Sequence, residues 1–203
     1  MYGSTWKGPG YHSRVPPGSH VHGTRDNLDC AVLLLRSPRR DHWLRAAAVL
    51  RAVLRLQDRD PDRKTYGIWP WLLEESLDQM APPDWNWADF CGADIATVLV
   101  ETPERVDAPL RDALREALRC AAEAIIRRNV GPGYTNIAIM GAGVTAAAGE
   151  ILQTPAFLDC GRARLERFDA HTSWHGGLNE YNSPTYTFVA LHELERILQL
   201  VRD

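Results

Sequence analysis

The segment from Ile137 to Gly149 is apolar around most of the circumference of a helix, and it constrains the fold more than any other part of the chain. A helix with one apolar stripe can lie at a surface, but a helix that is apolar on all sides must be enclosed by other elements. Its small residues, such as Gly141 and Gly143, allow close approach of neighbouring helices. The segment therefore predicts the inner helix of a layered assembly.

Capping residues and helix breakers predict further helices along the chain. No alternating strand pattern accompanies them, so the sequence predicts an all-α fold. Antiparallel pairs of helices, each taking roughly 40 to 50 residues, would build an α/α hairpin solenoid or toroid. Residues 1–25 read as an irregular lead-in and residues 26–203 as the helical domain. The expected helices span residues 26–35, 37–57, 86–100, 108–128, 135–152, 156–168 and 184–201.

Composition limits the classes of partner. The chain has 203 residues, 45% of them apolar, which is enough for one domain or one and a half with a sizeable core. A net charge of -3 gives no general attraction to nucleic acid or to an anionic membrane. Any anionic ligand must therefore be recognised locally.

The cysteines and termini give further expectations. The four cysteines are far apart without a CxxC pair, so we expect buried free thiols rather than a zinc or redox centre. The sequence shows no signal peptide or bilayer-spanning stretch, which predicts a cytoplasmic protein as written, or an exported one if the N-terminus is truncated. No P-loop, GxGxxG or GxSxG motif is present, and no cofactor is expected.

The segment Trp174–Tyr186 carries the densest mixture of proton-transfer groups. It contains His175, Glu180, Tyr181 and Tyr186, together with the amide of Asn182. Ser183 followed by Pro184 is typical of an N-cap and first helical position, which places Tyr181 on the loop entering a helix. Such groups suit acid and base chemistry beside a polar ligand. The alternative is a polar turn whose side chains satisfy neighbouring backbone groups.

A second segment, residues 69–89, combines four of the seven tryptophans with carboxylates and an amide. Aromatic faces stack on the apolar faces of sugar rings while polar groups bind the hydroxyls, so the composition favours a saccharide cleft. Burial of the tryptophans in a core is the alternative. The candidate binding residues are Trp85, Asn86, Trp87 and Asp89, which we expect to line the same cleft as Asn179–Tyr186.

Three smaller motifs add candidates. Tyr134 and Asn136 follow a glycine-rich turn before the apolar helix, where Asn136 either caps the helix or hydrogen-bonds a ligand. Arg25 is suited to a two-pronged grip on a carboxylate, although a surface loop explains it equally. His171 and His175 are four residues apart and can share a helical face, but without a third ligand no metal site is predicted.

Three sequence stretches together resemble the helical toroid of the alginate lyase and heparinase II/III-type proteins. These are DWNWADF at Asp84–Phe90, YTNIAIMGA at Tyr134–Ala142 and NEYNSPTY at Asn179–Tyr186. The resemblance implies that an amide or cation, Asn136 or Arg25, neutralises a uronate carboxylate. It also implies a base that removes the C5 proton and a tyrosine that protonates the leaving oxygen. The chain is too short to close a six-hairpin ring, so we expect an incomplete (α/α)6-type toroid.

We therefore expect a carbohydrate-active domain, a polysaccharide lyase that cleaves an acidic oligo- or polysaccharide by β-elimination. His175 is the expected base and Tyr181 the expected acid, with Tyr186 able to exchange roles with Tyr181. A glycoside hydrolase that uses two carboxylates such as Glu180 and Asp89 is the first alternative. A non-catalytic helical module that binds a glycan or protein is the second.

Overall fold

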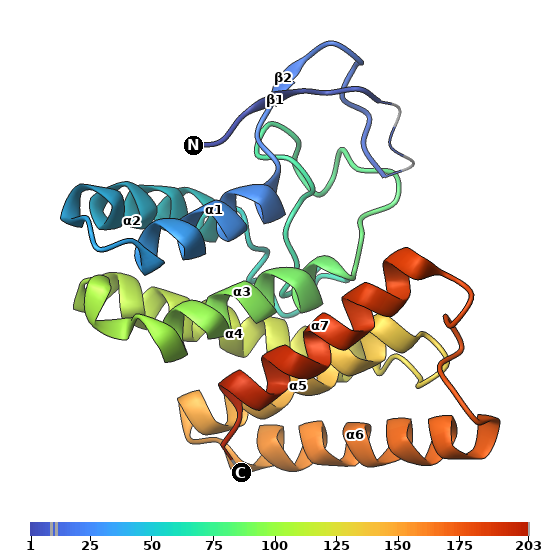
Figure 1. Cartoon of the computed structure of the whole chain (residues 1–203). Helices are drawn as coiled ribbons and strands as arrows, with labels where there is room; N and C mark the ends of the chain where they lie inside the picture. The colour runs from blue at the N-terminus through green and yellow to red at the C-terminus, as the bar shows by residue number, and fades with distance from the viewer. Residues whose placement is uncertain (9, 11, 203) are drawn as a thin grey trace. The chain divides into compact units, whose positions relative to one another are not determined.

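The computed structural model describes residues 1–8, 10 and 12–202. Within these residues it contains seven α-helices, one short 3-10 helix (Pro103–Arg105) and one sheet of two two-residue strands (Figure 1). The predicted all-α class is confirmed. The chain divides into two compact units, residues 1–121 and residues 122–203. The boundary between them lies within α4 (Ala108–Arg128).

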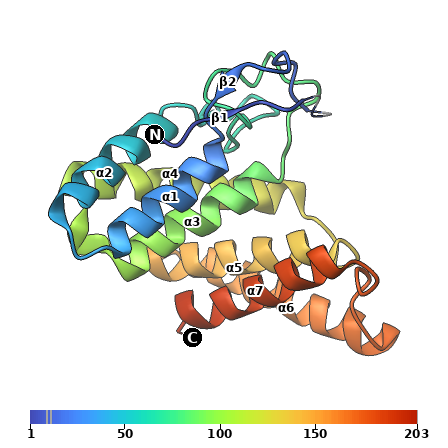
Figure 2. The same cartoon turned by 45° about the horizontal axis from the view of Figure 1, so that its top comes forward.

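The helices of the first unit are α1 (Thr24–Arg36), α2 (Arg40–Leu54), α3 (Trp87–Glu101) and the beginning of α4. Helix α1 packs against both α2 and α3 (Figure 2). Each contributes an apolar face to this contact, and Leu28, Leu35, Leu50 and Ile95 are fully buried. Burial of such side chains is the main favourable term in helix packing.

Above these helices lies a mostly non-helical layer made from residues 1–8, 10, 12–23 and 55–86, which we call the loop layer. Strands β1 (Ser4–Thr5) and β2 (His20–Val21) pair in antiparallel fashion, a feature absent from the predicted irregular lead-in. Backbone hydrogen bonds join the two halves of the layer to each other and to the start of α1. Among them, the N–H of Leu73 donates to the carbonyl of His22 at 2.9 Å, and that of Thr24, the first residue of α1, donates to the carbonyl of Trp71 at 2.9 Å. The lead-in is therefore tied to residues fifty positions further along the chain.

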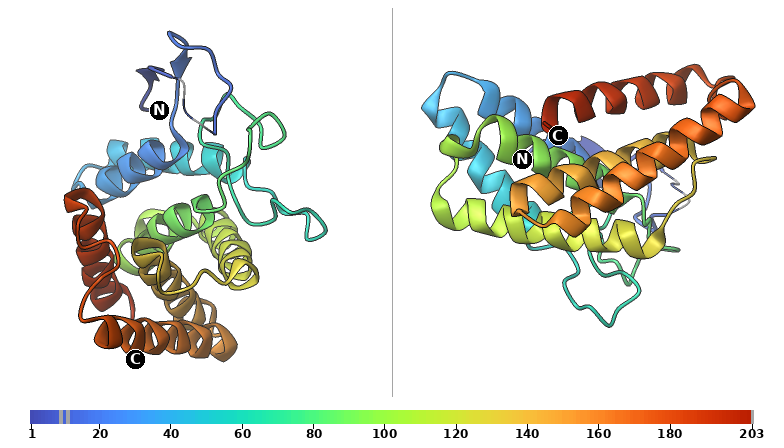
Figure 3. Two further views of the ribbon diagram at one scale, coloured as in Figure 1. Left: turned by 90° about the vertical axis from the view of Figure 1, so that its right-hand side faces the viewer. Right: turned by 90° about the horizontal axis from the view of Figure 1, so that it is seen from below.

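The second unit is built from α5 (Thr135–Leu152), α6 (Pro155–His175) and α7 (Pro184–Leu200). Helix α5 contacts both others, and every residue from Thr135 to Gly149 is buried, as expected of an inner helix (Figure 3). Glycines permit the close contacts: a Cβ on Gly161 would lie 2.7 Å from Ala146 Cβ, and one on Gly143 would lie 2.6 Å from Ile197 Cγ1.

Three helices have boundaries that differ by several residues from those predicted. Helix α1 is preceded by Gly23 rather than capped by Asp26 or Asn27, because the Asn27 side chain bonds the carbonyls of Tyr2 and Gly23. Helix α2 begins at Arg40 and ends at Leu54, not at residues 37 and 57. Helix α6 continues past residue 168 to His175, since the chain offers no breaker before Gly176, whose φ of 78° ends the helix.

Two other expectations were that the cysteines are buried free thiols and that no stretch is long and apolar enough to span a bilayer. All four cysteines are free, but only Cys91 and Cys120 are buried, and burial raises the pKa of both thiols. Among the described residues, α5 is long and apolar enough to cross a bilayer, contrary to the expectation that no such stretch exists. However, 83% of this helix is buried within the protein, and an apolar composition is equally typical of a core helix.

Candidate functional site

Three segments of the second unit meet around the loop that leads into α7. The Glu180 carboxylate accepts a hydrogen bond from the backbone N–H of Asn136, at the start of α5, with a distance of 3.0 Å. His171 Nε2, near the end of α6, lies 3.0 Å from Asn179 Oδ1. We call these residues, with His175, Tyr181 and Tyr186, the loop–helix cluster. A carboxylate at a helix N-terminus is stabilised there by the unpaired N–H groups and the helix dipole.

Two imidazoles lie on one face of α6, as their spacing predicts. The ring centroids of His171 and His175 are 4.3 Å apart, and that of Trp174 lies 4.4 Å from that of His175. His175 is exposed, and Trp174 is 82% exposed. An exposed imidazole can accept a proton from a ligand bound at the surface. Among the described residues, no group of three or more side chains has the arrangement of a metal site.

The phenols of this region also face solvent. Tyr181 is 78% exposed, Tyr186 is 47% exposed, and Tyr134 and Asn182 are exposed as well. Ser183 caps α7 as predicted, because its Oγ accepts from the N–H of Tyr186 at 3.4 Å, and this fixes the backbone beside both tyrosines. Both tyrosine side chains are thus accessible to a ligand, while the Ser183 cap fixes the backbone between them.

Asn136 differs from these groups because its side chain is buried. The residue is 2% exposed, and its Oδ1 has no hydrogen-bond partner among the described residues. Its predicted alternative role as N-cap is wrong, since Tyr134 occupies that position and Glu180 supplies the acceptor. The amide of Asn136 therefore lies in the interior rather than beside the exposed hydroxyls.

Sequence reasoning missed Asn179 as a site residue. The residue is exposed on the loop, and its side-chain amide joins the cluster through His171. Gly133 leaves room for it, because a Cβ there would lie 3.2 Å from Asn179 Nδ2. The signal that the sequence offered was its position immediately before Glu180. Its contact with His171 could not be foreseen, because the predicted helix ended at residue 168 whereas α6 continues to His175.

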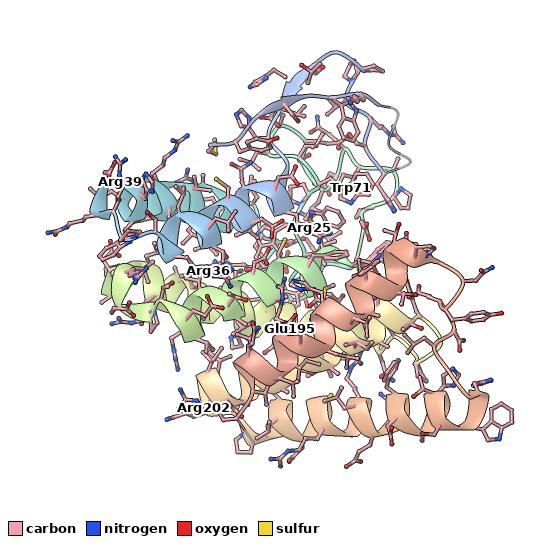
Figure 4. The ribbon with its side chains drawn as sticks, viewed as in Figure 1. Arg25, Arg36, Arg39, Trp71, Glu195 and Arg202 are labelled. Atoms are coloured by element: carbon pink, nitrogen blue, oxygen red, sulfur yellow. The ribbon has the colours of Figure 1, made fainter. Side chains whose placement is uncertain are left out.

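The predicted binding residues of the first unit include part of an aromatic row. Trp87 stacks on Trp71 with ring centroids 5.2 Å apart and meets Phe90 edge-on at 5.5 Å. His12 lies 4.9 Å from Trp71 at one end of the row, and the guanidinium of Arg25 lies 4.1 Å above the Phe90 ring at the other. Figure 4 labels Trp71 in the loop layer and Arg25 in the first turn of α1. Stacking and the cation–π contact stabilise this row.

Asp84 holds the row in place. Its carboxylate accepts hydrogen bonds from Trp71 Nε1 and from the backbone N–H of Asn86, both at 3.0 Å. His12 Nε2 lies 3.9 Å from the same carboxylate, while His12 Nδ1 is 2.6 Å from the carbonyl of Pro82. Asp84 itself is buried, so the loop layer is organised around a carboxylate with specific partners.

The remaining predicted residues of this unit have mixed exposure. Trp85 is half-buried and donates through Nε1 to the carbonyl of Lys64 at 3.0 Å, whereas Asp89 is buried in the first turn of α3. Trp87 is half-buried, and its Nε1 is enclosed without a partner among the described residues. These residues belong to the first unit and the loop–helix cluster to the second, so a common cleft stays a prediction.

The comparisons with known proteins give a family but no relative of known activity. No curated protein and no solved structure matches the chain. One family model, described as Domain of unknown function (DUF8769), matches residues 7–201 and so covers both units. The chain therefore belongs to the DUF8769 family.

Proposed function

We propose that the protein is a carbohydrate-active domain that cleaves uronate-containing polysaccharides by β-elimination. The observation that supports this most is the loop–helix cluster. His175, Tyr181 and Tyr186 are exposed at the end of α6, on the loop after it and in the first turn of α7. The loop itself is bonded to α5 through Glu180 and to α6 through Asn179. An imidazole and a phenol are the acid and base groups that such an elimination requires. The resemblance of the same sequence segments to toroidal lyases supports the same reaction.

In the proposed mechanism, His175 removes the proton from C5 of the uronate. The electron pair forms a double bond between C4 and C5, the bond from C4 to the leaving oxygen breaks, and Tyr181 protonates that oxygen. Tyr186 can take the role of Tyr181. The resemblance assigns neutralisation of the carboxylate to Arg25 or Asn136, but the Asn136 amide is buried. The exposed residue Asn179 is the amide that the loop offers instead.

The hydrolase alternative is less well supported by the geometry. Hydrolysis needs two carboxyl groups about 5 to 10 Å apart across the scissile bond. Glu180 already accepts a hydrogen bond from the start of α5, and Asp89 is buried in the other unit. A single carboxylate beside imidazole and phenol groups favours elimination.

We also propose that the helices are part of an incomplete (α/α)6-type toroid. In the second unit, α5 and α6 pack as a hairpin, and α7 also packs against α5. Helix hairpins are the unit of such a ring. Helix α7 supports the idea with an exposed apolar stripe formed by Phe188, Leu191 and Leu198. Spacings of three and seven residues place these side chains on one face, where a further helix can pack.

The test of activity uses ultraviolet absorbance of an unsaturated uronate product, with the full-length protein and alginate, heparin and pectate as substrates. Tyr181→Phe should lower turnover by about 10²- to 10⁴-fold without unfolding the protein, because only an exposed hydroxyl is removed. His175→Gln should cost a similar factor and change the pH profile, and Trp87→Ala should act mainly on affinity. Tyr2→Phe, at another exposed tyrosine, is the matched control.

The outcomes separate the three functions. Unchanged turnover in Tyr181→Phe removes that residue from the mechanism. New reducing ends without a gain in ultraviolet absorbance support the hydrolase. Glycan binding without turnover of any substrate supports the non-catalytic module.

A further inference from the structure

A pocket of about 480 Å³ lies in the first unit, apart from every residue discussed as a site above. The end of α2 supplies Arg51 and Leu54, and the residues after it supply Arg55, Gln57 and Arg59. The first turns of α4 supply the opposite wall, which consists of Pro109, Leu110 and Ala113. This volume lies within the range of pockets that bind small molecules, roughly 300 to 1,000 Å³.

The floor of this pocket is apolar and rigid. Leu54 and Leu110 are buried, and Pro109 and Ala113 complete the apolar surface. Gln57 fixes the wall, because its Nε2 donates to the carbonyls of Gly67 at 3.2 Å and Ala117 at 2.9 Å. A pocket that is already held in shape costs less ordering when it binds a ligand.

The rim is positively charged. Arg51 is paired with Asp107, whose other oxygen accepts from the N–H of Leu110 at 2.9 Å, so one carboxylate is already part of the pocket edge. Arg55 and Arg59 are exposed and form no ion pair within the described part of the chain. The pocket edge thus carries three guanidinium groups and the Asp107 carboxylate, and Arg59 also interacts electrostatically with Glu116.

We propose that this pocket binds a small organic anion with an apolar body, such as an aromatic carboxylate. The floor formed by Leu54 and Leu110 takes the apolar body, and the guanidinium groups of Arg55 and Arg59 bind the anionic group. Guanidinium pairs readily with carboxylate oxygens because its donors match their planar geometry. The site shares no residue with the loop–helix cluster, and it stands whether or not the protein cleaves glycans.

The experiment is isothermal titration calorimetry of the whole chain with 2-naphthoate at fixed ionic strength. We expect saturable binding at one site, weakened about tenfold or more in Arg55→Ala/Arg59→Ala, the loss expected from removing charge-assisted hydrogen bonds. Ala113→Leu should also weaken binding by filling the pocket while leaving all three arginines in place. Arg40→Ala/Arg45→Ala, which removes two exposed arginines from the first turns of the same helix, should bind as the native chain does.

Two other probes test the two halves of the proposed ligand. The neutral analogue 2-naphthalenemethanol should bind much more weakly than 2-naphthoate, and inorganic phosphate should compete poorly because it lacks an apolar body. Absence of 2-naphthoate binding overturns the proposal. It is equally overturned by unchanged affinity in Arg55→Ala/Arg59→Ala, by equal loss in the control pair, or by equal affinity for either probe.

Discussion

Helix α5 and the loop layer both contain buried side chains, but different forces hold them. Helix α5 is enclosed by apolar contacts, and glycines bring α6 and α7 against it. The loop layer contains few regular elements and depends on buried polar side chains, among them Asp84 and Gln57, whose partners are distant in sequence. We therefore expect the free energy of unfolding to be most sensitive to added side-chain volume where α6 and α7 contact α5, and to the loss of hydrogen-bond partners in the loop layer.

The largest expected effect comes from adding one methyl group at Gly149. A Cβ at this position would lie 2.7 Å from Leu158 Cα, a backbone atom that cannot move without shifting α6. Intrinsic helix propensity alone would make Gly149→Ala stabilising by about 1 kcal/mol. We expect the clash to dominate, so that the free energy of unfolding falls by about 3 kcal/mol, measured by urea denaturation followed by circular dichroism.

Gly131→Ala is the matched control, because no heavy atom lies within 4 Å of the added Cβ. Its effect should stay within about 0.5 kcal/mol. Stabilisation by Gly149→Ala would mean that α5 and α6 are packed less tightly than the structure indicates.

The second effect concerns the partners of Asp84. Asp84→Ala removes the acceptor of the hydrogen bonds from Trp71 Nε1 and from the N–H of Asn86, so we expect a loss of about 2 kcal/mol from the free energy of unfolding. Tryptophan fluorescence is a suitable measurement for the first unit, which holds every tryptophan except Trp174.

Asp62→Ala provides the comparison, since Asp62 is exposed and its side chain accepts no hydrogen bond in the described structure. Asp84→Asn retains one acceptor oxygen and should lie between Asp84→Ala and the native chain. If Asp84→Ala and Asp62→Ala have equal effects, the carboxylate does not organise the loop layer.

The same contrast explains how far the sequence could predict the fold. Burial of α5 and the start of α7 at Ser183 and Pro184 depend on periodicity and local capping, which a single sequence displays. The contacts of Asp84 with Trp71 and His12 span 13 and 72 residues, and no local pattern records such pairings.

The candidate site divides in the same way. The four-residue spacing of His171 and His175 indicates that they can share a helical face, and they do so because α6 continues past residue 168, where the predicted helix ended. The contacts of Glu180 with Asn136 and of Asn179 with His171 depend on how three segments converge, and they were missed. The sequence therefore showed which functional groups these segments carry, but it did not show that the Asn136 amide is buried.

The smallest expected effect is the response of the first unit to acid. Several of its carboxylates have a lowered pKa, among them Glu116, through the hydrogen bond from Arg119, and Asp107, through those from Leu110 and Arg51. For Glu74, burial raises the pKa, but hydrogen bonds from the backbone N–H and imidazole of His22 outweigh this and lower it. A lowered folded pKa means that protonation opposes folding.

The sign of the pH dependence follows from these shifts. The stabilisation is complete above the unfolded pKa values, 4.5 for glutamate and 3.8 for aspartate, and it is lost as pH falls through the lower folded values. Because these carboxylates are solvent-screened, the contribution of Glu74 should be less than about 1 kcal/mol. Glu74→Gln should therefore reduce stability slightly at pH 6 and flatten the decrease between pH 6 and pH 3, measured by urea denaturation with tryptophan fluorescence in a Trp174→Phe background. Glu166→Gln, at an exposed carboxylate of the second unit, is the control and should leave that decrease unchanged. If stability decreases equally in Glu74→Gln and in the native chain, the hydrogen bonds from His22 do not contribute to acid sensitivity.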